Sequence, residues 1–144
     1  IPVMGHVGLT PQSVNLMSGY KIQGKSFHSA QKILDDSRAL QDAGVFSIVL
    51  ECIPSELAKK ITHELSIPTI GIGSGPCCDG QIQVFHDILG MSNNFNPKHA
   101  KKYSDLYQII KKSIIQYSKD VSNKKFPGKK NYTSIDKNII DKLK

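Results

Sequence analysis

The chain has 144 residues and a net charge of +7, a length that suits one domain. No window approaches the ~18 uninterrupted apolar residues that a membrane span needs, which argues against a membrane protein. The three cysteines, Cys52, Cys77 and Cys78, lack the spacing of a metal site and are expected to be reduced thiols of a cytoplasmic protein. Residue 1 is Ile, and residues 1–4 already have a strand-like pattern, so we expect further sequence upstream.

The charge is distributed unevenly along the chain. Residues 1–97 carry a net charge of −2, whereas residues 98–144 carry +9 from thirteen Lys and four Asp. This basic block could attract nucleic acid or another polyanion, and a non-enzymatic polyanion-binding module is one alternative function. The block contains no Arg and no recognised nucleic-acid motif, so the favoured interpretation is a solvated Lys-rich helix face and tail. We therefore expect neither nucleic acid nor a membrane as a partner.

Strand-like and helical patterns alternate along the chain. They predict strands at residues 2–5, 46–50, 69–72 and, more weakly, 82–85, and helices at residues 29–43, from 54–56 onward with Ser55 as N-cap, and at 98–122. A further short helix is predicted to start at Thr10, in the long loop after the first strand. Alternating elements of this kind form βαβ units with a parallel sheet. Half of an eight-stranded (β/α) barrel and an open doubly wound sheet are the two structural alternatives.

Glu51 ends an apolar strand, at the edge where parallel α/β enzymes place their active sites. A carboxylate there is costly unless it is paired or used. Strand alternation places Glu51 on one face with Ser47 and Val49, and puts a bulkier set on the other face: Phe46, Ile48, Leu50 and Cys52. A general base is favoured over a carboxylate satisfied by a neighbouring Lys or by loop amides.

Other candidate residues also follow the predicted strands. His6 follows the first strand and is either a functional histidine or one that caps a turn, with neither favoured. The glycines of residues 71–75 either form a phosphate cradle, which would indicate a phosphate-binding barrel enzyme, or make room for a ligand or for neighbouring strands. His86 and Asp87 could bind a metal, but adjacent strand residues point to opposite faces, which favours structural roles. The remaining histidines are expected at the surface: His28, His63 and His99.

Seven stretches share their order and spacing with one enzyme family. They are residues 5–13 (GHVGLTPQS), 19–24 (GYKIQG), 49–54 (VLECIP), 67–75 (IPTIGIGSG), 79–84 (DGQIQV), 86–87 (HD) and 126–128 (FPG). Together they resemble ketopantoate hydroxymethyltransferase, an enzyme of pantothenate biosynthesis. The resemblance covers residues 1 to about 128.

The resemblance implies a (β/α)₈ TIM-type barrel, with residues 1–128 forming its last four β/α units and residues 129–144 a poorly ordered Lys-rich tail. It implies hydroxymethyl transfer from 5,10-methylenetetrahydrofolate to the keto acid 3-methyl-2-oxobutanoate, giving 2-dehydropantoate. Glu51 would be the proton acceptor, and His6 would lie against the keto acid. Mg²⁺ would be held by the preceding half of the barrel, so no residue here is expected to bind metal and the chain alone is expected to be inactive. A homo-oligomer is also implied.

Overall fold

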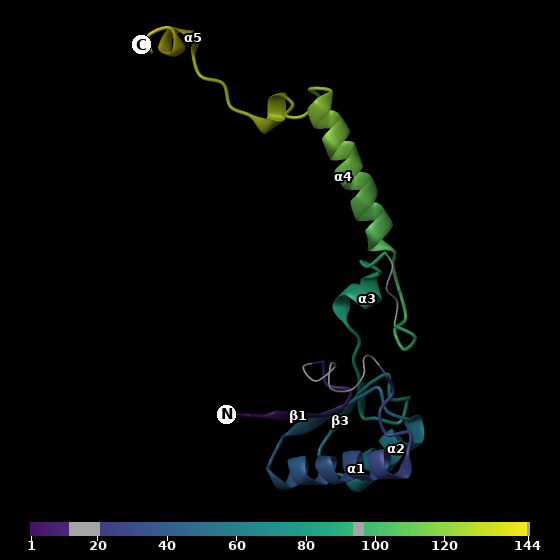
Figure 1. Cartoon of the computed structure of the whole chain (residues 1–144). Helices are drawn as coiled ribbons and strands as arrows, with labels where there is room; N and C mark the ends of the chain where they lie inside the picture. The colour runs from purple at the N-terminus through teal and green to yellow at the C-terminus, as the bar shows by residue number, and fades with distance from the viewer. Residues whose placement is uncertain (12–20, 94–96, 144) are drawn as a thin grey trace.

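A four-stranded parallel sheet organises the first part of the chain in the computed structural model, which describes residues 1–11, 21–93 and 97–143. The strands lie in the order β1 (Met4–Gly8), β2 (Ser47–Glu51), β3 (Thr69–Ile72) and β4 (Gly80–Gln81). Two helices, α1 (Phe27–Asp42) and α2 (Ser55–Glu64), pack against one face of the sheet (Figure 1). The predicted α/β class with a parallel sheet is confirmed.

The hydrophobic core lies between the sheet and these two helices. Ile48 and Leu50 of β2 are completely buried and share one cluster with strand and helix residues: Val7, Ile33, Leu34, Ile53, Ala58, Ile61 and Leu65. Burying a side chain of this size stabilises the fold by roughly 1.5–3 kcal/mol. The predicted alternation of β2 is therefore confirmed for Ile48 and Leu50. It is wrong for Phe46, which precedes the strand and is 53% exposed.

The helix ends show where local sequence rules hold. Ser26 caps α1, because its hydroxyl accepts from the Ser29 N–H, and Ser29 in turn accepts from the Ser26 N–H. This capping box starts the helix two residues earlier than predicted. In α2 the predicted N-cap, Ser55, is wrong. The first helical hydrogen bond runs from the Ala58 N–H to the Pro54 carbonyl, so Ser55 is already inside the helix.

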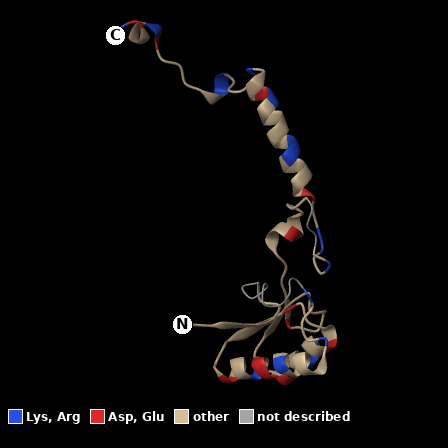
Figure 2. Cartoon of the chain, viewed as in Figure 1, with Lys and Arg blue, Asp and Glu red and all other residues tan. Residues whose placement is uncertain are grey.

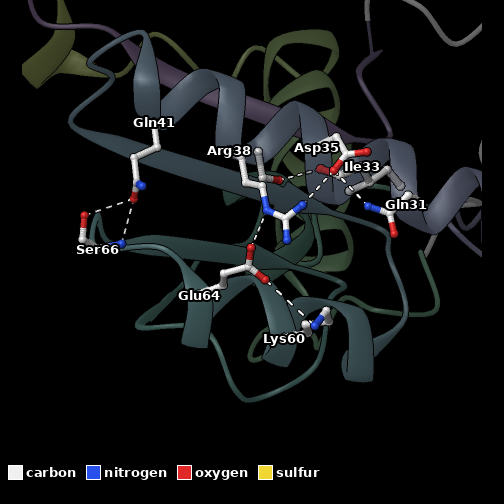
Figure 3. A network of polar contacts seen from close by, with 9 residues as sticks. Gln31, Ile33, Asp35, Arg38, Gln41, Lys60, Glu64 and Ser66 are labelled. Carbon is white, nitrogen blue, oxygen red and sulfur yellow. Dashed lines mark hydrogen bonds and ion pairs between the residues drawn. The ribbon is translucent and has the colours of Figure 1, made fainter.

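Polar side chains hold α1 and α2 side by side on their outer surface (Figure 3). Arg38 of α1 donates to Glu64 of α2, and its other guanidinium branch lies 2.9 Å from Asp35. At the far end of the pair, the Gln41 side-chain oxygen accepts from the Ser66 N–H at 2.7 Å. These contacts are exposed and individually weak. They fix the relative position of two helices that already share the core.

The fourth predicted strand is largely wrong. β4 has two residues, and residues 85–89 instead form the short helix α3 (Phe85–Leu89), which contains His86 and Asp87. The Ile82 N–H still donates to the Gly71 carbonyl at 3.0 Å, but β3 ends at Ile72. A strand needs a partner for its backbone groups, and none of the described strands continues beside residues 83–85.

The last long helix is shorter than predicted. α4 (Leu106–Ser122) begins eight residues later than the predicted start at Lys98, because the backbone before it bonds to other elements. The Lys101 N–H donates to the Gln83 side chain, and the Tyr103 N–H donates to the Ile88 carbonyl. No residue of α4 is buried, and the helix extends away from the sheet (Figure 1).

The chain ends in a basic segment that follows α4. It contains a 3-10 turn (Lys129–Asn131) and a short helix, α5 (Lys137–Ile140). Figure 2 shows blue Lys residues on α4 and on this segment, and acidic residues on α1. None of the described helices is long and apolar enough to cross a membrane. The short helix predicted to start at Thr10 falls mainly on residues 12–20, outside the described residues.

Replacing Ile48 by Ala tests the buried face of β2. The side chain is completely buried, so the substitution is expected to lower the free energy of unfolding by about 2–5 kcal/mol. Ile109→Ala is the matched control, since Ile109 of α4 is 57% exposed and is expected to change stability by no more than about 0.5 kcal/mol. Urea unfolding followed by circular dichroism measures both. Equal effects would contradict the core assignment.

Candidate active site

The structure brings together Glu51, the last residue of β2, and His6, which lies within β1 and does not follow the strand as predicted. In the parallel register, His6 pairs with Val49 and Gly8 pairs with Glu51, which puts His6 and Glu51 on the same face of the sheet. The His6 Nε2 atom lies 3.0 Å from the Glu51 Oε2 atom. The Glu51 side chain is 15% exposed and that of His6 33%, so both are partly shielded but accessible.

The backbone around Glu51 is held from both sides. Its carbonyl accepts from the Leu9 N–H at 2.8 Å, and the next N–H, of Cys52, donates to the Ile72 carbonyl at 2.9 Å. Gly8 makes the first of these bonds possible. It has a φ of +91°, and a Cβ atom there would lie 2.1 Å from the Glu51 carbonyl oxygen. The strand ends therefore fix the position of Glu51 before any ligand is bound.

This arrangement suits proton transfer. An ionised carboxylate accepts hydrogen bonds, and the imidazole donates one to it when Nε2 carries the proton. The second carboxylate oxygen, Oε1, has no hydrogen bond among the described residues and is open to accept a proton. The partner of Glu51 is thus a histidine, and neither a Lys nor a loop amide takes that place in the described part of the chain. The one hydrogen bond that the His6 ring makes among the described residues is this contact with Glu51.

Cys52 and His99 extend the site toward β3. Cys52 has a φ of +50°, an uncommon value for a residue other than glycine, and its side chain is buried as predicted. Burial raises the pKa of its thiol, and the charge of Glu51 raises it further. The sulfur lies 3.7 Å from the Nδ1 atom of His99. His99 is exposed, as expected, but its position at the site was missed, because no spacing in the sequence links it to residues 47 positions earlier.

The glycines of residues 71–75 are packed against side chains of this chain. A Cβ atom on Gly71 would meet the Cys78 sulfur at 2.9 Å, and one on Gly75 would meet the Ser55 Cβ at 2.5 Å. Between them, Ser74 is buried and its hydroxyl donates to the Leu50 carbonyl at 2.7 Å. The positions that a Cβ atom on Gly71 or Gly75 would take are therefore occupied by side chains of this chain.

The acidic and sulfur-containing residues in the described part of the chain do not assemble a metal site. His86 and Asp87 lie on α3 and not at a strand end, and Asp87 is buried. Within residues 1–11, 21–93 and 97–143, no three His, Cys, Asp or Glu side chains are grouped so that they could hold a metal ion. The residues described here therefore do not fit a resident Mg²⁺ ion.

Comparison with known proteins identifies the family. The family model for ketopantoate hydroxymethyltransferase matches residues 1–129. The chain belongs to this family. It is 54% identical to 3-methyl-2-oxobutanoate hydroxymethyltransferase of Carboxydothermus hydrogenoformans, over 99% of this chain and 52% of that protein. It is 55% identical to the Dehalococcoides mccartyi enzyme of the same name, over 100% of this chain and 51% of that protein. A Clostridium botulinum relative of that name is 52% identical, over 99% of this chain and 52% of that protein.

This ketopantoate hydroxymethyltransferase family member spans about half the length of the curated relatives that it matches. The resemblance drawn from the sequence motifs is confirmed. The relatives named above are hydroxymethyltransferases by name, which agrees with the class of enzyme that the motifs indicated.

Asp79 anchors the start of β3, at the end of the strand away from this site. Its Oδ2 atom accepts from the Thr69 N–H at 2.8 Å and from the Thr69 hydroxyl at 3.0 Å. These hydrogen bonds hold the pKa of the Asp79 carboxyl below its ordinary value. Thr69 is completely buried, so this exposed carboxylate satisfies a donor that water cannot reach.

Substituting Asp79 by Asn tests this anchor through pH. A lowered folded-state pKa gives stability that is present above the ordinary Asp pKa of about 3.9 and is lost as pH falls through the folded-state value. We expect the Asp79→Asn protein to be less stable than the parent at pH 7, with a difference that shrinks in acid. The urea midpoints of the parent and Asp79→Asn proteins, at pH 7 and in acid, measure this difference in stability. Asp42→Asn, a substitution at an exposed residue, is the control. A difference that grows in acid would contradict the assignment.

Proposed function

We propose that the protein to which this chain belongs transfers a hydroxymethyl group from 5,10-methylenetetrahydrofolate to 3-methyl-2-oxobutanoate, giving 2-dehydropantoate. The observation that carries the proposal is the 3.0 Å contact between His6 and Glu51 at the carboxyl edge of a parallel sheet, in a chain of this family. A carboxylate at this edge, with one oxygen bonded and one open, suits removal of a proton from carbon. The names of the relatives agree with the reaction type.

In the proposed mechanism Glu51 is the general base. Its open oxygen removes the C3 proton of the keto acid, and the enolate carbon forms a bond to the methylene carbon of the donor. The bonds from that carbon to the two donor nitrogens break, and a water molecule supplies the hydroxyl group. One nitrogen takes the remaining proton of that water and the other takes the proton held by Glu51, so tetrahydrofolate leaves and the base is regenerated. His6 orients the carboxylate through their shared hydrogen bond and lies where it can contact the bound keto acid.

The Mg²⁺ ion implied by the resemblance does not fit the residues described here, which form no group of metal ligands in the described ranges. We propose that any metal ligands belong to the part of the enzyme that this chain does not include. We also propose that this other part of the enzyme completes the barrel. β1 has no partner on its outer edge among the described strands, and strands from the remaining half would pair there to close a (β/α)₈ barrel.

Two further proposals concern organisation. Residues 1–128 would form the catalytic half-barrel, and residues 129–144 a Lys-rich tail outside it. α4 exposes a row of large apolar side chains, which is the pattern of a helix that is covered in an assembly: Ile110, Ile114, Tyr117 and Val121. This supports a homo-oligomer of the cytoplasmic enzyme, with small molecules as its substrates.

The role of Glu51 is tested in a completed enzyme, made by joining the N-terminal half of the Carboxydothermus relative to residue 1. Glu51→Gln keeps the size of the side chain but removes its basicity, so kcat is expected to fall by about 10²- to 10⁴-fold. Glu56→Gln, on the exposed side of α2, is the matched control and should keep full activity. Steady-state turnover with both substrates is the measurement. A Glu51→Gln enzyme with near-normal kcat would refute the proposal.

The isolated 144-residue chain provides a second test. We expect no hydroxymethyl transfer when it is mixed with Mg²⁺, 3-methyl-2-oxobutanoate and 5,10-methylenetetrahydrofolate, because its described residues supply a base but no metal site. Product formation is followed by mass spectrometry, with the completed enzyme as the positive control. Turnover by the isolated chain would show that the site is complete without another half.

A further inference from the structure

Two imidazoles lie on opposite sides of β2, one against Glu51 and the other against Cys52, the next residue. His6 comes from β1, and His99 lies at the end of β3, which is on the opposite side of β2 in the strand order. His99 is far along the chain, in the segment between α3 and α4. The Lys101 N–H bonds to Gln83 at 2.6 Å and the Tyr103 N–H to Ile88 at 2.8 Å, which ties this segment back toward the sheet.

The His99 ring has a defined seat. A Cβ atom on Gly73 would lie 2.9 Å from the ring carbon Cγ, so the imidazole rests where any other side chain at position 73 would stand. Gly73 has a φ of +65°, which glycine adopts without strain. On another side, Nδ1 lies 3.7 Å from the Cys52 sulfur. The ring is thus exposed to solvent but fixed by residues at the ends of two strands.

One ring nitrogen is left for a ligand. Nδ1 is occupied by Cys52, and Nε2 has no hydrogen bond among the described residues. The Cys52 thiol has a raised pKa because of its burial, so it stays protonated and can donate to Nδ1. The other nitrogen would then carry the imidazole proton. The result is a flat ring with a donor edge, held at the rim of the site.

We propose that His99 binds the heterocyclic ring of the one-carbon donor. This inference rests on the proposed function, in which the keto acid lies against His6 and loses its proton to Glu51. In this inference the donor carbon approaches from a side that His6 does not occupy, and the β3 side, where His99 is seated, is one such side. A reduced pterin presents ring nitrogens and a carbonyl oxygen to a donor edge, and a planar face to an imidazole.

Substitution of His99 in the completed enzyme tests this. His99→Ala is expected to raise the KM for 5,10-methylenetetrahydrofolate by about 5- to 20-fold, the loss of about one contact, while kcat and the KM for the keto acid change less than about twofold. His63→Ala, an exposed histidine on α2, is the control and should change neither KM. Partial restoration of the donor KM by His99→Gln or by His99→Phe would also support a ligand contact, through hydrogen bonding or ring packing respectively.

If His99 had only a structural role, a different result would be expected. Equal rises in both KM values, or an unchanged donor KM, would overturn the inference. Iodoacetamide labelling of Cys52, read by peptide mass spectrometry, checks the seat itself, because removal of the covering ring should speed labelling in His99→Ala but not in His63→Ala. Unchanged labelling would contradict the contact.

Calorimetry with tetrahydrofolate separates this inference from the proposed function. Binding that weakens in His99→Ala supports the donor contact even if the completed enzyme shows no turnover, a result that would refute only the proposed reaction. Normal turnover together with unaltered tetrahydrofolate binding in His99→Ala would refute only the role of His99.

Discussion

The site and the core both depend on the pairing of β2 with a parallel strand on each side. Side chains alternate along a strand, so burial of Ile48 and Leu50 under the helices forces Val49 and Glu51 onto the opposite face. A shift of one residue in this register would bury the carboxylate and expose the core. The same hydrophobic contacts that stabilise the fold therefore determine where the candidate base stands.

Pairing also supplies the partners that make a shielded carboxylate acceptable. Removing a charged group from water is costly unless hydrogen bonds replace the lost solvation. Strand β1 brings His6 to the side chain of Glu51, while the Leu9 N–H bonds to its carbonyl. On the other side β3 receives the Cys52 N–H and carries the glycine on which His99 rests. One backbone hydrogen bond and one imidazole thus lie on each side of β2.

The elements predicted correctly are those that local pattern specifies. The apolar periods of β1, β2 and β3 and the amphipathic stripes of α1 and α2 were visible in the sequence, because the core that they form uses contiguous segments. The predictions failed where an element needs a distant partner. Residues 82–85 have strand composition but lack a neighbouring strand among those described, and residues 98–105 have helical spacing but bond to Gln83 and Ile88.

For the candidate site, the sequence by itself determined that Glu51 ends an apolar strand and which face it occupies, because alternation is a property of one segment. The family motifs added the reaction class. Only the tertiary structure decided that His6, 45 residues away, is the partner of Glu51, and that His99 lies beside Cys52. It also filled the space beside Gly71 and Gly75 with the chain's own side chains. Contacts between separate segments depend on register and loop paths, which packing of the whole sheet sets and no local pattern encodes.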